Sequence, residues 1–78
     1  MNSINQDEPL YNVFVRNWWR DAGRDSMGKR MREPGAGPKR YKVKGVNWTE
    51  ARRICELYNT THKPGFLSRK AEFEQCRN

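Results

Sequence analysis

Two stretches of the chain alternate between apolar and polar positions, which is the pattern of half-buried β-strands. Residues 10–19 (LYNVFVRNWW) are rich in β-branched and aromatic side chains, and residues 40–46 (RYKVKGV) repeat the alternation. In the second stretch Lys42 and Lys44 fall opposite the apolar residues, so this strand should present a cationic face to solvent. We expect the two strands to pair in an antiparallel sheet.

Residues 47–59 change to the helical period, with five apolar side chains on one stripe. Asn47 can cap the N-terminus of this helix, and Glu50 stands three residues later, where a capping-box carboxylate reaches back. The helix should end near Asn59, because residues 60–65 (TTHKPG) have the composition of a loop. The stripe consists of Trp48, Ala51, Ile54, Cys55 and Tyr58.

The segment 67–73 (LSRKAEF) fits two patterns. As a third strand it places Leu67, Ala71 and Phe73 on the inward side. As a short helix it begins at Ser68, because the residues that follow are good helix formers. Both alternatives stay open on the sequence.

Between the first two strands lies a segment that shows neither the alternation of a strand nor the period of a helix. From 20 to 39, basic residues alternate with Gly and Pro, a mixture that cannot bury a core or propagate a helix. We therefore predict a flexible basic arm at 20–39, a long basic loop between the first two strands. The predicted fold is α+β, a small ββα(β) domain at 10–75 with one helix packed on a short antiparallel sheet. A disordered tail is predicted at 1–9.

The positive charge is concentrated in the same part of the chain. Sixteen Lys and Arg against nine Asp and Glu give the 78 residues a net charge of +7. Residues 1–10 carry −2, residues 11–46 carry +7 from ten basic and three acidic side chains, and residues 47–78 carry +2. This distribution favours a contact surface over a uniform solubilising shell.

Length and composition exclude several classes of protein. Seventy-eight residues allow one small domain, no stretch approaches the roughly 20 apolar residues of a membrane span, and the polar start lacks the apolar segment of a secretory signal. Two cysteines are too few for a secreted disulfide scaffold, so we expect a cytoplasmic, reducing location. The core should be thin, which predicts a homodimer.

Motifs for catalysis and for metal binding are weak. Residues 23–29 (GRDSMGK) match a P-loop as far as its lysine, but Arg30 stands where Ser or Thr would hold magnesium, so we interpret the match as chance. Cys55, His62 and Cys76 lack the paired short spacings of a structural zinc site. The one histidine has no identifiable orienting partner. We predict no cofactor, no metal and no enzymatic activity.

Basic and aromatic residues gather where the first strand meets the arm. Adjacent tryptophans in a strand point to opposite faces, so at most one of Trp18 and Trp19 should lie in the core. Aromatic faces stack on unpaired bases while Lys and Arg neutralise phosphates, and an exposed aromatic equally suits a protein partner. The candidate binding residues are Phe14, Arg16, Trp18, Trp19, Arg20, Arg24, Lys29, Arg30, Arg32, Lys39, Arg40, Lys42 and Lys44.

Two blocks of the sequence resemble small uncharacterised accessory proteins of bacteriophages and prophages. One is residues 11–19 (YNVFVRNWW). The other includes residues 50–52 (EAR), 54–55 (IC), 58–59 (YN), 64–65 (PG) and 67–73 (LSRKAEF). The resemblance covers most of residues 11–73. It implies a small phage accessory protein, often non-catalytic, that works by binding a host component, and inhibitors of CRISPR or other host defences are one such class.

These observations together predict a non-catalytic binding protein of the anti-defence type. It would block or redirect a host nucleic-acid-handling complex, and its partner would be a host protein or ribonucleoprotein complex. The alternative is a small basic protein that contacts single strands of nucleic acid directly. Either function would use the same basic and aromatic surface.

Overall fold

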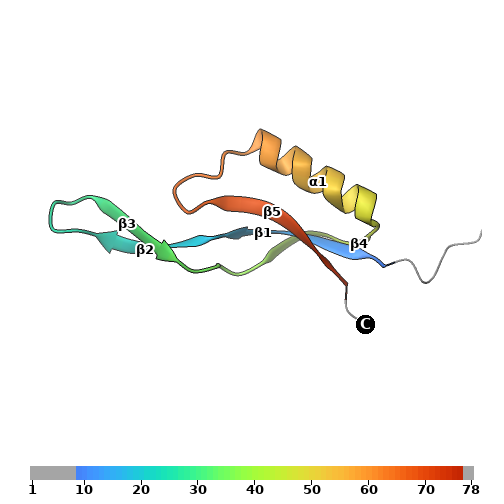
Figure 1. The fold of residues 1–78 in the computed structure, drawn as a ribbon, viewed down its shortest axis with the longest axis horizontal. Coiled ribbons are helices and arrows are strands. Elements are labelled where there is room, and N and C mark those ends of the chain that lie inside the picture. Colours follow the sequence, from blue (N-terminus) through green and yellow to red (C-terminus); the bar gives the residue numbers. More distant parts are fainter. Residues whose placement is uncertain (1–8, 77–78) are drawn as a thin grey trace, which may run out of the picture.

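The computed structural model describes residues 9–76, which form five antiparallel strands in two sheets and one helix (Figure 1). The elements are β1 Tyr11–Asn17, β2 Trp19–Arg24, β3 Arg30–Pro34, β4 Arg40–Val46, α1 Trp48–Thr61 and β5 Arg69–Gln75. One sheet has the order β4-β1-β5, and β2 and β3 form the other. This confirms the predicted α+β class. The tail predicted at 1–9 lies, apart from Pro9, outside the described residues.

The central strand of the three-stranded sheet is β1. It pairs antiparallel with β4, as predicted for the two alternating stretches, and also with β5. Pairing with β5 runs without interruption from Tyr11 opposite Gln75 to Asn17 opposite Arg69, whereas the pairing with β4 has two register shifts. Of the two alternatives for 67–73, the strand is therefore the right one, although it begins and ends two residues later.

The helix α1 begins at the predicted cap. The side-chain oxygen of Asn47 accepts a hydrogen bond from the Glu50 N–H at 2.8 Å. The Glu50 carboxylate, which the capping-box pattern directs back to Asn47, pairs instead with Arg53. The helix continues two residues past Asn59, through Thr60 and Thr61, whose hydroxyls donate to the carbonyl oxygens of Glu56 and Leu57.

The core between α1 and the three-stranded sheet is as thin as the composition predicts. α1 packs on β5 and β1, and the buried side chains between them are small. The predicted helical stripe is right for Ala51 and Cys55, which are buried. It is wrong for Trp48, which is 47% exposed because its ring lies beside the Arg52 guanidinium on the solvent side. The buried cluster is Val13, Val15, Ala51, Cys55 and Ala71.

Residues 19–34 form a β-hairpin, so the flexible arm predicted at 20–39 is wrong for most of its length. β2 and β3 pair antiparallel, with Trp19 opposite Pro34 at the base of the hairpin. The first strand also ends earlier than predicted, at Asn17. There the chain bends, and the N–H groups of Trp18 and Trp19 donate to the carbonyl oxygen of Leu67.

Turn chemistry and ion pairs hold this hairpin together without a core. The Asp25 carboxylate accepts hydrogen bonds from the N–H groups of Met27 and Lys29 at 2.9 and 2.8 Å. Gly28 has φ +82°, a left-handed conformation that favours glycine. The residues that indicated a loop in the sequence thus act as turn and cross-strand partners. The ion pairs are Arg20–Glu33 at 3.6 Å and Arg30–Asp21 at 3.2 Å.

The hairpin gives the molecule an elongated shape. It extends the three-stranded sheet at the end away from the start of α1, at the left of Figure 1. The molecule measures 65 × 27 × 13 Å, with a radius of gyration of 16.7 Å. A compact domain of this length would have a radius of gyration of about 11.5 Å. The structure therefore has a small core and a long projecting element.

Candidate interaction surface

The hairpin leaves its side chains in solvent. In β2 and β3 only Trp19 is half-buried, and every other residue is exposed. No hairpin residue belongs to the buried cluster. Near the tip, Met27 is 91% exposed and Met31 is 39% exposed. The hairpin is therefore available for contact along its whole length.

Alternating cations and aromatic rings stiffen the base of the hairpin. The guanidinium carbon of Arg32 lies 4.5 Å from the ring centroid of Trp19 and 5.6 Å from that of Phe66, and the guanidinium carbon of Arg30 lies 4.3 Å from the Phe66 centroid. Arg32 also donates to the Phe66 carbonyl oxygen at 2.6 Å. We call this set, Trp19, Arg32, Phe66 and Arg30, the cation–aromatic ladder. It ties the hairpin to the loop between α1 and β5.

The hairpin carries only part of the positive charge of residues 11–46. Residues 19–34 hold five basic and three acidic side chains, a net charge of +2. Arg20 and Arg30 are paired with acidic residues across the hairpin. The Arg24 side chain donates to the Gly28 carbonyl oxygen at 2.8 Å. Arg24 and Lys29 carry the positive charge nearest the tip, where Asp25 is engaged with main-chain N–H groups.

Other predicted binding residues lie on the opposite face of the sheet from α1, which we call the open face. Because Val13 and Val15 face the helix, the side chains of Phe14 and Arg16 project to the open face. Phe14 is only 5% exposed, so it cannot present its ring to a base as predicted. Its ring is enclosed by long cations, with the Arg16 guanidinium carbon at 5.5 Å and the Lys39 Nζ at 4.9 Å from its centroid.

Two residues next to Phe14 stay accessible on this face. Trp18 is 37% exposed, and its ring lies 5.3 Å from the Arg16 guanidinium carbon. Neither Trp18 nor its neighbour Trp19 belongs to the buried cluster. Tyr41 is 42% exposed, with the Lys44 Nζ at 4.7 Å from its ring centroid. The open face thus combines exposed aromatic rings with cations.

A carboxylate offsets part of that positive charge. Glu74 forms an ion pair with Lys39, and the Tyr41 hydroxyl donates to Glu74 at 2.7 Å. These two hydrogen bonds hold the pKa of the Glu74 carboxyl below its ordinary value. The bond to Glu74 in turn raises the pKa of the Tyr41 hydroxyl. Lys39 is therefore a structural partner of Glu74 and not an unengaged cation.

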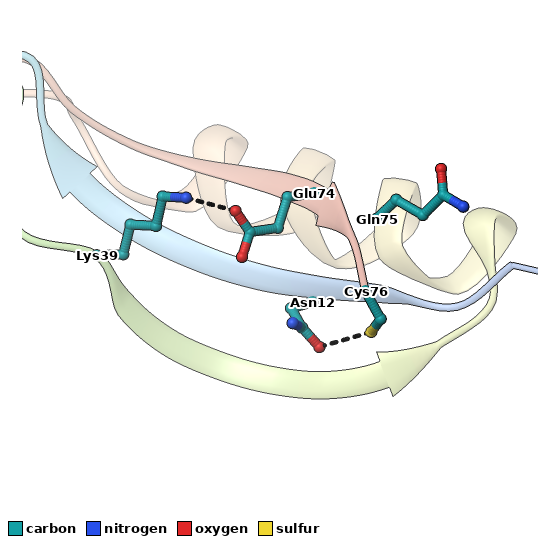
Figure 2. A pocket seen from close by; sticks show the side chains of 5 residues that line it. All are labelled: Asn12, Lys39, Glu74, Gln75 and Cys76. Atoms are coloured by element: carbon teal, nitrogen blue, oxygen red, sulfur yellow. Dashed lines mark hydrogen bonds and ion pairs between the residues drawn. The ribbon is translucent and has the colours of Figure 1, made fainter. Parts of the chain in front are cut away.

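An open hollow of about 700 Å³ lies beside this ion pair (Figure 2). Within it the Cys76 thiol lies 3.0 Å from the side-chain oxygen of Asn12 and donates to it. The polar groups that Figure 2 joins by dashed lines are thus engaged with one another. The lining residues are Asn12, Lys39, Glu74, Gln75 and Cys76.

β4, an edge strand, carries the remaining predicted cations. Arg40, Lys42 and Lys44 are all exposed, and within residues 9–76 none of them forms an ion pair. They occupy a stretch of five residues that contains no acidic side chain. This edge is the part of the described surface where unpaired positive charge is densest along the chain.

The sequence motifs for phosphate and metal chemistry find no support in their surroundings. The P-loop-like residues 23–29 end β2 and form the hairpin turn, and strand β3 follows them where a P-loop requires a helix. Cys55 is buried in the core, His62 stacks on Tyr58 with ring centroids 4.0 Å apart, and Cys76 is on the open face. Among the described residues no three His, Cys, Asp or Glu side chains group to hold a metal.

Comparison with known proteins assigns neither a family nor a function to the chain. Searches of protein-family models, of curated proteins and of solved structures found no match to the chain. Within residues 9–76 no helix is long and apolar enough to cross a membrane. The resemblance to phage accessory proteins stays a prediction.

One residue of the surface, Phe66, was not predicted from the sequence. It stands in the loop after α1, next to Gly65, and has no periodic neighbours. Its partners Arg30 and Arg32 lie more than thirty positions earlier in the chain, as the separation of 34 residues between Arg32 and Phe66 shows. An aromatic residue flanked by turn residues is the one signal that could have identified it.

Proposed function

We propose that this protein is a non-catalytic phage accessory protein of the anti-defence type, which binds and blocks or redirects a host nucleic-acid-handling complex. The observation that carries this proposal is the projecting hairpin, which is exposed along both strands and takes no part in the core. Arginine and aromatic side chains dominate the binding free energy of protein interfaces, and the hairpin base concentrates both. The hairpin is therefore the contact element.

The cation–aromatic ladder prepares the hairpin for binding. It fixes Arg30 and Arg32 against aromatic rings before a partner arrives, so fewer rotamers are lost on association. Near the tip, the exposed methionines supply adaptable apolar contacts. Arg24 and Lys29 steer this end toward an acidic groove on a host protein or ribonucleoprotein complex.

Shortening the hairpin tests this function. Arg20 lies opposite Glu33, so replacing residues 21–32 by Asn-Gly closes the hairpin there with a two-residue turn. The variant should fold, because the buried cluster contains no hairpin residue. We expect affinity capture from host lysate to recover a partner with the parent chain and to lose it with the shortened one.

A matched control separates hairpin contacts from net charge. The shortened variant loses four basic and two acidic residues, and the double variant Arg52→Ala, Arg53→Ala also lowers the net charge by two. Both arginines lie on the exposed side of α1. The control should capture the partner as the parent does. Capture that survives hairpin shortening would sink the proposal.

Direct binding to single strands is the second candidate, and the unpaired cations of β4 favour it. Here Arg40, Lys42 and Lys44 would neutralise phosphates while Trp18 stacks on a base. Oligonucleotide should then quench tryptophan fluorescence, with an affinity that falls steeply as salt rises. Nuclease treatment of the lysate should abolish capture under this function and leave a protein partner bound under the first. An absence of quenching at low salt would eliminate direct binding.

A further inference from the structure

A small hollow lies where the hairpin joins the three-stranded sheet. It has a volume of about 40 Å³ and sits between the end of β1 and the beginnings of β4 and β5. None of its lining residues is acidic. They are Val15, Arg16, Asn17, Pro38, Arg40 and Arg69.

Register places two of these arginines around the hollow. Val15 lies opposite Arg40 on β4, and Asn17 lies opposite Arg69 on β5, so both arginines project from the same face of the sheet on either side of β1. Strand spacing and rise put their Cα atoms about 12 Å apart, which two arginine side chains can bridge. Arg16 projects to the open face, where its guanidinium lies beside Phe14 and Trp18.

The hydrogen-bond partners of these side chains leave donors for a ligand. The Nε of Arg69 donates to the side-chain oxygen of Asn17 at 3.0 Å, which orients the guanidinium and leaves its terminal amino groups available. The Arg40 side chain has no hydrogen-bond or ion-pair partner within residues 9–76, and both arginines are exposed. Two guanidinium groups around one hollow repel each other unless an anion lies between them.

The size and donors of the hollow indicate the ligand. A volume of about 40 Å³ admits about three water-sized atoms, which suits the oxygens of one phosphoryl group. Guanidinium groups bind phosphate through paired N–H donors, and the Asn17 amide can add another. We propose that Arg40 and Arg69, with Asn17, form a phosphate-binding site. The site lies outside the hairpin and so goes beyond the first proposed function. It shares Arg40 with the second candidate function but does not rest on it, because its ligand can also be a free phosphate.

The phosphate could belong to a nucleic-acid backbone or to a small phosphorylated molecule, and three probes distinguish these sources. They are inorganic phosphate, thymidine 5′-monophosphate and a short oligothymidine without terminal phosphates, each titrated into the full-length ¹⁵N-labelled chain at constant ionic strength. We expect localised shifts of the Arg40 and Arg69 Nε–H signals and of the Asn17 amide. Tightest binding by the oligothymidine assigns a backbone phosphate, and tightest binding by either small probe assigns a free one.

Arg40→Gln is the main variant, because Arg40 has no side-chain partner within residues 9–76 to lose. It should weaken binding of the tightest probe about tenfold, the loss expected for a charge-assisted hydrogen bond. Arg40→Lys keeps the charge but loses the paired donors, so it should recover only part of that affinity. The control Arg52→Gln removes an exposed arginine on α1 and should bind as the parent does.

Two results would overturn the site. One is a set of shifts spread evenly over all basic residues with every probe. The other is an Arg40→Gln variant that binds as tightly as the parent. Neither result depends on the hairpin, because the variant that lacks residues 21–32 retains the hollow. Phosphate binding by that variant, together with loss of partner capture, would show that the two surfaces act separately.

Discussion

A single asparagine side chain closes part of the sheet edge. The Asn59 amide nitrogen donates to the Ala71 carbonyl oxygen at 3.1 Å, and its oxygen accepts from the Ala71 N–H at 2.9 Å. Asn59 thus satisfies, from α1, the two main-chain groups that a further strand would bond, and both hydrogen bonds are partly buried. This contact joins helix and sheet in the first half of β5.

Asn59→Ala should therefore destabilise the fold. It leaves two main-chain groups without partners, which costs about 2 kcal/mol in the free energy of unfolding and lowers Tm by roughly 10 °C. Thermal unfolding followed by circular dichroism measures the change. Thr60→Ala is the matched control, since within residues 9–76 its hydroxyl bonds only to the exposed Glu56 carbonyl oxygen. It should change stability by less than about 0.5 kcal/mol. Equal effects of both variants would contradict the role of Asn59.

The Glu74 ion pair makes the stability of the open face depend on pH. The pKa of Glu74 is lowered from 4.5, so its contribution is present above that value and is lost as pH falls through the pKa in the folded chain. The pKa of Tyr41 is raised from 10.0, so its contribution is present below that value and is lost as pH rises through the pKa in the folded chain.

Glu74→Gln tests this pH dependence on both its acidic and its alkaline side. The variant should unfold at lower urea concentration than the parent near neutral pH, because it lacks the charge that Lys39 and Tyr41 bond. The difference between the two midpoints should shrink toward acid, where Glu74 becomes protonated in the parent, and shrink again toward alkali, where Tyr41 ionises. Urea midpoints measured across the pH range check this. A difference that is constant with pH would contradict it.

At the scale of elements, alternation predicted β1 and β4, and helical periodicity predicted α1 with its Asn47 cap. The hairpin was not predictable in the same way. Neither β2 nor β3 has a buried face, so no apolar period marks them. Their pairing depends on the Asp25 turn and on ion pairs between residues nine and thirteen positions apart, for which sequence periodicity has no signal.

The hairpin tip should open independently of the core. Asp25→Ala removes the acceptor of the Met27 and Lys29 N–H groups, so amide exchange at these positions should accelerate about tenfold or more. The amides of Val13 and Val15 should keep their protection, because they lie in the buried cluster. Hydrogen exchange followed by NMR measures both. Ser26→Ala, at the same tip, should leave exchange unchanged. Equal acceleration in the core would show that hairpin and core unfold together.

For the whole molecule, a thin core and a high charge act against each other. The small buried cluster favours association with a second copy, whereas a net charge of +7 opposes it. The predicted homodimer should therefore form more readily as salt screens the charge. Light scattering after size exclusion, at high micromolar protein and at about 0.05 and 0.5 M salt, measures the mass. A monomer mass under both conditions would contradict the dimer.

The candidate surface was predictable in composition and only partly in arrangement. Trp19, Arg30 and Arg32 do come together, but around Phe66, which lies in a distant loop. Phe14, one of the predicted binding residues, is instead covered by Arg16 and Lys39. Long cationic side chains can bury an aromatic ring on a face that no helix covers, and only their three-dimensional packing shows it.

The sequence by itself determined the α+β class, the pairing of β1 with β4, the capped helix and the place of the positive charge. These depend on local periodicity and composition, which each segment carries alone. Only the tertiary structure decided that residues 19–34 project as a hairpin, that Glu74 engages Lys39, and that Arg40 and Arg69 share a hollow. Those features depend on which distant strands and loops become neighbours, and strand register fixes that only in the folded chain.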